Sequence, residues 1–338
     1  MPALRPYQEV GRDWLLSRLR AGLADEAGIG KTVQACAALE RVAKTAVVVC
    51  PASVVPVWES HLREWAPSVR TKVMSYDRAR RRALTETVDV LILDEAHYLK
   101  NPASRRTRAI YGPGCSGAGM MRRAERVWLL TATPAPNHPG EYWPHFRALL
   151  PPYSVPTKYH DFLTRYCHVR STPYGLAPVG IRAQHAQELM RLINSLFLRR
   201  RLEDVALDLP NWSWEPLRLA IPDVGDLRKL AAENGRAAEL LRVLESVESV
   251  DDVLPALEQA APALSTLRRM TGVLKAPAVV EWAHNYLLTG RKLVVYAVHH
   301  DVLNTLHSQL AAYSPVQVIG SLSAAQRRAA VDAFQTDP

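Results

Sequence analysis

Asp25-Glu-Ala-Gly-Ile-Gly-Lys-Thr32 is the stretch that decides the fold of this 338-residue chain. Its two glycines, Gly28 and Gly30, carry no side chain, so backbone N–H groups around them can closely approach phosphate oxygens. Lys31 offers a positive charge to the terminal phosphates, and Thr32 offers a hydroxyl ligand to a magnesium ion. The stretch therefore predicts a phosphate-binding loop that opens a helix.

The loop departs from the usual G-x-x-x-x-G-K-[ST] pattern at one position, where Asp25 stands in place of the first glycine. The residues that follow support the prediction. A helix-like stretch covers residues 33–43, and the apolar run Thr45-Ala-Val-Val-Val-Cys50 after it is typical of a buried strand. A glycine loop, a helix and a buried strand in this order indicate an α/β nucleotide-binding domain.

A second string, Asp94-Glu-Ala-His97, follows the apolar run Val88-Asp-Val-Leu-Ile-Leu93. Ligand sites of open parallel sheets lie beyond the carboxyl ends of the strands, so these carboxylates are expected beside the glycine loop. We expect Asp94 to hold Mg²⁺ together with Thr32, because magnesium takes few protein ligands and keeps several waters. Glu95 is expected to orient or deprotonate an attacking water. The two strings together predict hydrolysis of a nucleoside triphosphate.

Seven segments along the chain resemble the successive motifs of the Snf-family superfamily-two helicase-like ATPases. They are Leu4-Arg-Pro-Tyr-Gln8, Asp25 to Thr32, Val49-Cys-Pro-Ala-Ser53 with Trp58 and Trp65, Ser75-Tyr-Asp77, Asp94 to His97, Leu130-Thr-Ala-Thr-Pro134 with Asn137, and Leu198-Arg-Arg-Arg-Leu-Glu-Asp-Val205 with Leu209-Pro210. The small annealing-helicase-like branch is the most similar, through Phe162-Leu-Thr-Arg-Tyr-Cys167, Leu267-Arg-Arg-Met-Thr-Gly272 and Lys292-Leu-Val-Val-Tyr296.

The resemblance implies a role for each matching residue, with ATP and Mg²⁺ as cofactors. Gln8 would recognise adenine, and Lys31, Thr32, Asp94 and Glu95 would form the catalytic set. The nucleotide-binding loop would comprise Asp25, Glu26, Ala27, Gly28, Ile29, Gly30, Lys31 and Thr32. The residues that couple the nucleotide to movement between lobes would be His97, Thr131 and Thr133, and those that touch a DNA backbone would be Pro51, Ser53, Ser75 and Tyr76.

Positive charge is concentrated in the first part of the chain. Residues 1–200 hold 29 Lys and Arg against 16 Asp and Glu, a net charge of +13, whereas residues 201–338 carry −4. Such a field fits a surface that follows a nucleic-acid backbone and gains affinity by counterion release. Arginine clusters occur at Arg78, Arg80, Arg81 and Arg82, at Arg105, Arg106 and Arg108, and at Arg122 and Arg123.

Alternating strand-like and helix-like segments predict an α/β fold in three parts. Residues 1–156 are expected to form a RecA-like P-loop lobe, a parallel sheet flanked by helices, with strands near 46–50, 88–93 and 127–131. Residues 157–285 are expected to form helical protrusions and the link between lobes. Residues 286–338 are expected to begin a second RecA-like lobe that is incomplete, with strands at 292–298 and 316–319 and helices at 301–312 and 324–334.

The resemblance implies a DNA-dependent ATPase that couples ATP hydrolysis to movement on, or remodelling of, duplex or forked DNA. The family's arginine-bearing motif, which faces ATP across the cleft, has no counterpart in residues 286–338, and an arginine finger contributes about 10³–10⁵ in rate. One alternative is therefore a nucleotide- and DNA-binding module without turnover. A weaker alternative is a DEAH-type RNA helicase, which would share the Asp94-Glu-Ala-His97 string.

The remaining expectations concern partners and location. The implied partners are DNA, contacted mainly through its backbone, and a replication or repair protein or a chain that supplies the rest of the second lobe. No apolar run is long enough to span a bilayer, and the first residues lack a signal-peptide core, so we expect a cytoplasmic protein, nucleoid-associated in a bacterial or viral context. Four single cysteines indicate neither a disulfide framework nor a zinc ribbon.

Overall fold

The computed structural model describes residues 3–81, 84, 86–172, 175–205, 215–218, 235, 238, 242 and 261–336. The chain divides into two compact units, Met1–Asn211 and Trp212–Pro338. Arg82 of the first arginine cluster and the Leu209-Pro210 end of the last matching motif lie outside the described residues, as does most of the region between 206 and 260.

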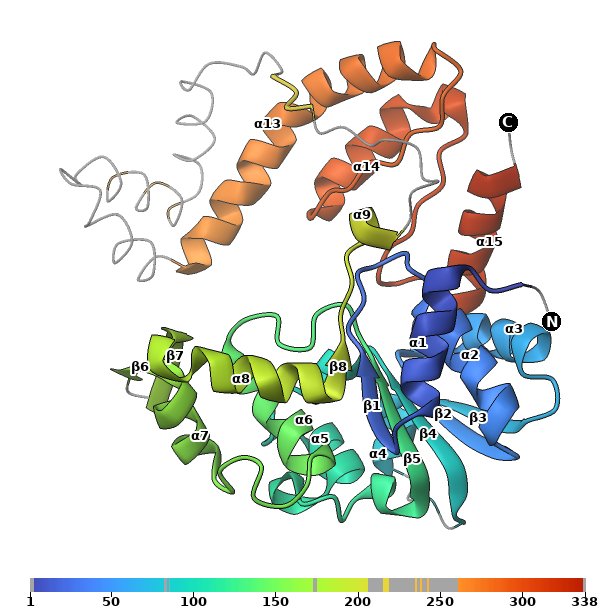
Figure 1. Cartoon of the computed structure of the whole chain (residues 1–338). Helices are drawn as coiled ribbons and strands as arrows, with labels where there is room; N and C mark the ends of the chain where they lie inside the picture. Colours follow the sequence, from blue (N-terminus) through green and yellow to red (C-terminus); the bar gives the residue numbers. More distant parts are fainter. Residues whose placement is uncertain are drawn as a thin grey trace. The chain divides into compact units, whose positions relative to one another are not determined.

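The first unit is built on a parallel sheet of six strands in the order β3-β2-β4-β5-β1-β8 (Figure 1). The strands are β1 (Arg20–Leu23), β2 (Thr45–Cys50), β3 (Arg70–Ser75), β4 (Val88–Asp94), β5 (Ala124–Leu130) and β8 (Phe197–Leu198). The strands predicted near 46–50, 88–93 and 127–131 are β2, β4 and β5. The predicted α/β class, with a parallel sheet flanked by helices, is confirmed.

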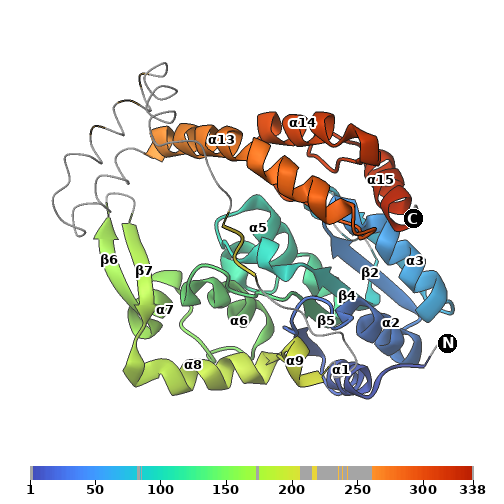
Figure 2. The same cartoon turned by 90° about the horizontal axis from the view of Figure 1, so that it is seen from above.

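Helices cover both faces of this sheet (Figure 2). On β4, Val90 and Ile92 pack toward α1, α2 and α3, while Leu91 and Leu93 pack toward α4, α5 and α6. A strand buried on both faces is apolar throughout, which explains the continuous runs in the sequence. The helices are α1 (Pro6–Leu16), α2 (Lys31–Val42), α3 (Val55–Trp65), α4 (Tyr76–Arg81), α5 (Arg105–Tyr111) and α6 (Trp143–Leu149).

Residues after α6 return to the same core. Phe162 and Tyr166 of α7 (Tyr159–Tyr166) and Leu196 of α8 (Ala183–Leu196) are buried against it. Between these helices lies an antiparallel hairpin, β6 (Cys167–Thr172) and β7 (Gly175–Ile181), in a range that we expected to be helical. α8 then leads into β8, which pairs with β1, and α9 (Leu202–Val205) follows. The division into residues 1–156, 157–285 and 286–338 stays a prediction.

Six short 3-10 turns complete the described elements. They are η1 (Ala52–Val54), η2 (Ala96–Leu99), η3 (Pro113–Cys115), η4 (Met120–Arg123), η5 (Pro139–Tyr142) and η6 (Ala311–Tyr313). No helix in the described part of the chain combines the length and the apolar composition needed to cross a membrane.

The second unit consists, where described, of α13 (Ala261–Leu287), α14 (His300–Gln309) and α15 (Ala324–Thr336). α13 and α14 pack through Ala276, Val302 and Leu306. The helices predicted at 301–312 and 324–334 correspond to α14 and α15. The strands predicted at 292–298 and 316–319 are wrong, because an apolar segment becomes a strand only by pairing, and the described residues there form no ladder.

Candidate active site

The phosphate loop, residues 25–30, joins β1 to α2 at the carboxyl edge of the sheet. Gly28 and Gly30 have φ angles of 89° and 83°, a left-handed conformation that other residues rarely adopt. A Cβ on Gly30 would lie 2.6 Å from Nε2 of Gln8, so this glycine also makes room for its neighbour. The N-terminal N–H groups of α2, which have no partner within the helix, lie at the loop. This is the geometry of a phosphate cradle.

Lys31 lies folded over the loop. Its Nζ donates hydrogen bonds to the carbonyl oxygens of Asp25, at 2.7 Å, and Glu26, at 3.1 Å. Burial lowers the pKa of Lys31, while the charges of nearby carboxylates, Asp25 first among them, oppose that shift. The ammonium group is thus held by carbonyl acceptors that a phosphate oxygen could replace.

Asp94 ends β4, and hydrogen bonds fix its carboxylate. Oδ2 accepts a bond from Nε1 of Trp58 at 2.7 Å, and Oδ1 accepts one from the backbone N–H of Glu95 at 3.0 Å. Burial raises the pKa of Asp94, and the bond from Trp58 opposes that rise. Glu95 has a φ of 50°, a left-handed backbone conformation, so the chain turns at the end of β4.

These groups fit a magnesium ion that binds together with a nucleotide. The half-buried Asp94 carboxylate gains from a nearby cation, and Thr32 offers a hydroxyl oxygen from the first turn of α2. The described residues include no group of three or more His, Cys, Asp or Glu that could hold a metal ion by themselves. A magnesium ion at this edge would therefore take its remaining ligands from phosphate oxygens and water.

We expect Trp58→Phe to move the acidic limb of the ATPase pH profile to higher pH. The Trp58 hydrogen bond stabilises ionised Asp94 against burial, so its loss raises the pKa of Asp94 further and protonation begins at a higher pH. The measurement is the rate of ATP hydrolysis from mildly acidic to neutral pH. Trp65→Phe, on the same helix, is the control, and coincident profiles for both variants would contradict the expectation.

Gln8 lies in the first turn of α1, beside the phosphate loop. Its Oε1 accepts a hydrogen bond from the N–H of Arg5 at 3.0 Å, and its Nε2 lies 3.5 Å from the carbonyl oxygen of Ile29. The side chain is therefore held at the mouth of the loop, where a base attached to bound phosphates could be reached. Its predicted role in adenine recognition stays a prediction.

The three predicted coupling residues occur together. His97 Nδ1 lies 3.2 Å from Oγ1 of Thr131 and 3.1 Å from Oε2 of Glu95. The hydroxyl of Thr131 also accepts a hydrogen bond from the N–H of Thr133 at 3.2 Å, and its own N–H donates to the carbonyl of Leu23 at 3.1 Å. Since Leu23 ends β1, one contact chain joins the Asp94–His97 turn, the Thr131–Pro134 turn and the strand that carries the phosphate loop.

Glu141, which the sequence did not reveal, links the segments that follow these two turns, through Lys100 and Asn137. Its Oε1 lies 2.9 Å from Nζ of Lys100, and its carboxylate accepts bonds from the backbone N–H and side-chain Nδ2 of Asn137, at 2.9 and 2.7 Å. Burial alone would raise the pKa of Glu141, but the hydrogen bonds from Asn137 and Lys100 outweigh it, so the pKa lies below its ordinary value of 4.5.

Glu141→Gln is expected to lower the free energy of unfolding at neutral pH by about 1–3 kcal/mol, because Lys100 loses its buried partner. The Glu141 carboxyl has a lower pKa in the folded than in the unfolded state, so it stabilises the fold at pH values above its unfolded-state pKa. This contribution disappears as the pH falls through the folded-state pKa. The difference between the variant and the unmodified protein should therefore shrink in acid. Urea unfolding at neutral and strongly acidic pH checks this, with the exposed Glu125→Gln as control.

The residues predicted to touch DNA lie at the carboxyl ends of β2 and β3. Pro51 and the exposed Ser53 follow β2, and Ser75 ends β3 with its hydroxyl accepting a bond from the N–H of Arg78 at 3.3 Å. Tyr76 differs from the other three, because its side chain is buried and donates to the carbonyl of Asp94 at 2.8 Å. Its hydroxyl supports the Asp94–His97 turn, so a DNA contact at this position would have to use backbone atoms.

The chain belongs to the SNF2-related domain family, whose model matches residues 7–92 and 81–223. This confirms the resemblance to Snf-family helicase-like ATPases. The match gives no support to a DEAH-type RNA helicase, despite the Asp94-Glu-Ala-His97 string.

Curated relatives match nearly the whole chain. The SWI/SNF-related matrix-associated actin-dependent regulator of chromatin subfamily A-like protein 1 of Xenopus tropicalis is 28% identical over 98% of this chain and 36% of its own length. Its homolog in Caenorhabditis elegans is 27% identical over 99% of this chain and 50% of its own length. The human DNA annealing helicase and endonuclease ZRANB3 is 26% identical over 99% of this chain and 33% of its own length. The chain thus spans between a third and a half of these relatives.

Proposed function

We propose that this chain is the ATP-binding part of a Snf-type DNA-dependent ATPase, which couples ATP hydrolysis to movement on, or remodelling of, duplex or forked DNA. One observation carries the proposal. The phosphate loop, the Asp94–Glu95 pair and the His97–Thr131 contact meet at the carboxyl edge of one parallel sheet.

In this proposal the loop N–H groups and Lys31 bind the phosphates and stabilise the negative charge that spreads over the transferred group. Thr32 and Asp94 would hold Mg²⁺, which supplies further positive charge to the phosphate oxygens when it is bound. Glu95 would orient or deprotonate the attacking water, with His97 at 3.1 Å to hold its carboxylate in place. Removal of the terminal phosphate would then be felt by Thr131 and Thr133 through His97.

DNA is the proposed second ligand. The net charge of +13 on residues 1–200 favours a polyanion, and Ser53 and Ser75 lie at the same sheet edge as the catalytic carboxylates. The names of two relatives place them with chromatin and with DNA annealing, which supports DNA over RNA and a role in DNA replication or repair. Binding should weaken as salt rises, with a log–log slope of about −0.7 to −0.9 per phosphate contacted.

The test is ATP turnover by the 338-residue chain, alone and with single-stranded DNA, duplex DNA, forked DNA or RNA. Stimulation by duplex or forked DNA is the expected result. Absent turnover with nucleotide and DNA binding both intact would instead identify a binding module, and stimulation by RNA alone would identify an RNA helicase.

A further inference from the structure

Asp25, the residue that breaks the glycine pattern of the phosphate loop, is buried with 0% of its surface exposed. A buried carboxylate is stable only with a partner of opposite charge and good geometry. Arg200 is that partner, 175 residues away in the chain: its Nε donates to Oδ1 of Asp25 at 3.0 Å, and its Nη2 donates to Oδ2. The pair is a two-pronged contact of the kind that a guanidinium forms best with a carboxylate.

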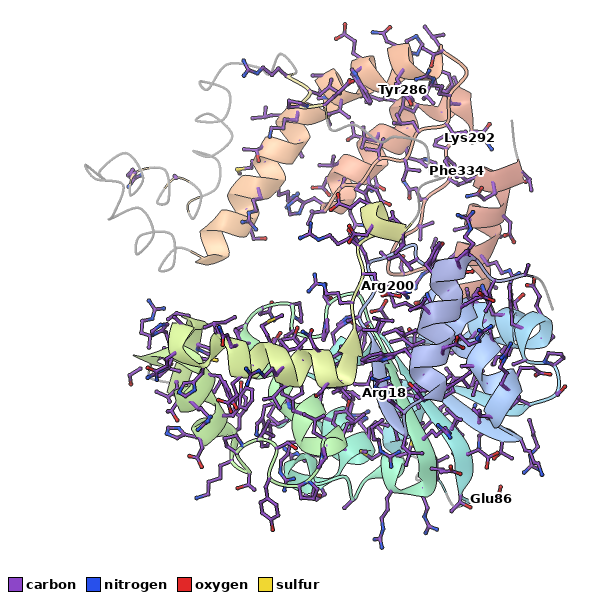
Figure 3. All side chains as sticks on the ribbon, in the orientation of Figure 1. Arg18, Glu86, Arg200, Tyr286, Lys292 and Phe334 are labelled. Atoms are coloured by element: carbon purple, nitrogen blue, oxygen red, sulfur yellow. The ribbon has the colours of Figure 1, made fainter. Side chains whose placement is uncertain are left out.

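The other donors of Arg200 reach two neighbouring elements. Nη2 also donates to Oε1 of Gln34 on α2, at 2.9 Å, and Nη1 donates to the carbonyl oxygen of Tyr7 on α1. Gln34 in turn donates from Nε2 to the carbonyl oxygen of Ile29 at 3.3 Å. Arg200 thus joins the helix that carries Gln8, the phosphate loop and the helix that begins at Lys31. Figure 3 shows Arg200 on the segment that follows β8, close to α1.

The backbone of this segment also runs along the first half of the loop. The N–H of Ala24 donates to the carbonyl of Leu198 at 2.7 Å, and the N–H of Glu26 donates to the carbonyl of Arg200 at 3.0 Å. The carboxylate of Glu26 accepts a bond from the N–H of Leu202 at 2.8 Å. The β1–β8 pairing therefore continues into the loop and leaves Asp25 facing Arg200.

A glycine on α1 leaves the space that this arrangement needs. A Cβ on Gly11 would lie 1.6 Å from Oε1 of Gln34 and 2.8 Å from Nη2 of Arg200. Neither distance is tolerable, so any side chain at this position would displace both groups. The contact of Arg200 with Asp25 and Gln34, called here the Arg200 clamp, is thus built into the packing of α1 against α2.

We propose that Arg200 is a positioning residue for the ATP site, which holds the first half of the phosphate loop open through Asp25. The inference rests on the proposed function. The carbonyl of Asp25 is also the acceptor for Nζ of Lys31, so the clamp fixes the place from which that ammonium group moves onto phosphate. In this proposal Arg200 contacts the loop through the carboxylate of Asp25 and acts on the nucleotide only through the loop.

The test compares four variants with the unmodified chain: Arg200→Ala, Asp25→Gly, the double variant, and Arg201→Ala as matched control. Arg201 is the next arginine of the same segment, and its exposed side chain pairs only with the exposed Glu203 in the described contacts. Binding of a fluorescent ATP analogue with Mg²⁺ and the rate of hydrolysis at saturating ATP are measured for each, and far-ultraviolet circular dichroism reports folding.

Arg200→Ala should weaken nucleotide binding at least about tenfold, because it leaves the buried Asp25 carboxylate without a cation and with only the 3.4 Å contact from Nε2 of Gln34. Arg201→Ala should bind within about twofold of the unmodified chain. The double variant should bind more tightly than Arg200→Ala alone, since it removes the unpaired charge as well, and this gain separates action through Asp25 from general damage. Saturating ATP should restore most of the hydrolysis rate of Arg200→Ala.

Three results would overturn the inference. One is binding by Arg200→Ala that equals binding by Arg201→Ala, while the unmodified chain binds normally. Another is a double variant whose fold-loss of nucleotide affinity equals the product of the fold-losses of the two single variants. If Arg200→Ala fails to fold, nucleotide affinity is compared between the double variant and Asp25→Gly. An affinity at least about tenfold lower in the double variant would then contradict the clamp, because Asp25 is already absent from both proteins. Absence of nucleotide binding by the folded unmodified chain would overturn the proposed function itself.

Discussion

Lys31→Ala is expected to reduce ATP turnover by at least about 10²–10³-fold and to weaken nucleotide binding as well. The ammonium group is the one cation of the phosphate loop, and it lies in the field of Asp25, Asp94 and Glu95. Without it, the phosphates would meet Asp94 and Glu95 at the sheet edge with less positive charge to offset them. The measurement is phosphate release together with titration of a fluorescent ATP analogue.

Lys44→Ala is the matched control for Lys31→Ala. Lys44 is exposed and lies just beyond the opposite end of α2, so its loss changes the net charge equally and leaves the loop intact. Turnover by Lys44→Ala should stay within about twofold of the unmodified chain. Equal losses in both variants would show that the total charge, rather than the charge at the loop, controls turnover.

Strands with a long apolar run could be predicted from the sequence, whereas the short strands β1 and β8 could not. β2, β4 and β5 each contain four or five consecutive apolar residues, a run typical of a strand that is buried on both faces. β8 has two residues and exists only because Phe197 and Leu198 pair with β1. The apolar segments at 292–298 and 316–319 show the converse, since they have a strand-like composition and no ladder in the described residues.

In the candidate site, too, local features could be predicted from the sequence, and contacts between distant segments could not. Gly28, Gly30 and Lys31 could be assigned from spacing, because a phosphate loop is a local structure whose backbone angles depend on the residues themselves. The contact between His97 and Thr131 could be anticipated only through the family resemblance, since 34 residues separate them. Tyr76 shows what the family resemblance could not predict. Its position in a motif does not reveal that its side chain is buried and that its hydroxyl bonds to the carbonyl oxygen of Asp94.

The polar contacts of Arg200 and Glu141 escape sequence reasoning for a physical reason. Each depends on a charged side chain that is stable when buried only because another segment supplies a partner. Asp25 offered a signal in the form of a carboxylate at a position where glycine is usual. A buried carboxylate at such a position predicts a positively charged partner from another segment. The sequence does not show which of the arginines in the first 200 residues is that partner.

Glu95→Gln is expected to lower ATP turnover by about 10²–10⁴-fold while nucleotide affinity stays within about twofold. Glutamine keeps the size of the side chain and an oxygen that can accept a hydrogen bond from His97 Nδ1, now 3.1 Å from Glu95 Oε2. It cannot take a proton from water. The φ of 50° at this residue is equally accessible to both side chains, so the turn after β4 should survive the change.

The comparison of Glu95→Gln with Lys31→Ala separates chemistry from binding. Lys31 is proposed to contact the phosphates throughout, so its loss should affect affinity and rate together. Glu95 is proposed to act on water, so its loss should affect the rate alone. Glu64→Gln, an exposed change on α3, controls for the loss of one negative charge. If Glu95→Gln hydrolyses ATP at the unmodified rate, Asp94 would be the only remaining carboxylate of the turn. Its oxygens are already engaged by Trp58 and the Glu95 N–H, so a role as base would then require that those bonds break.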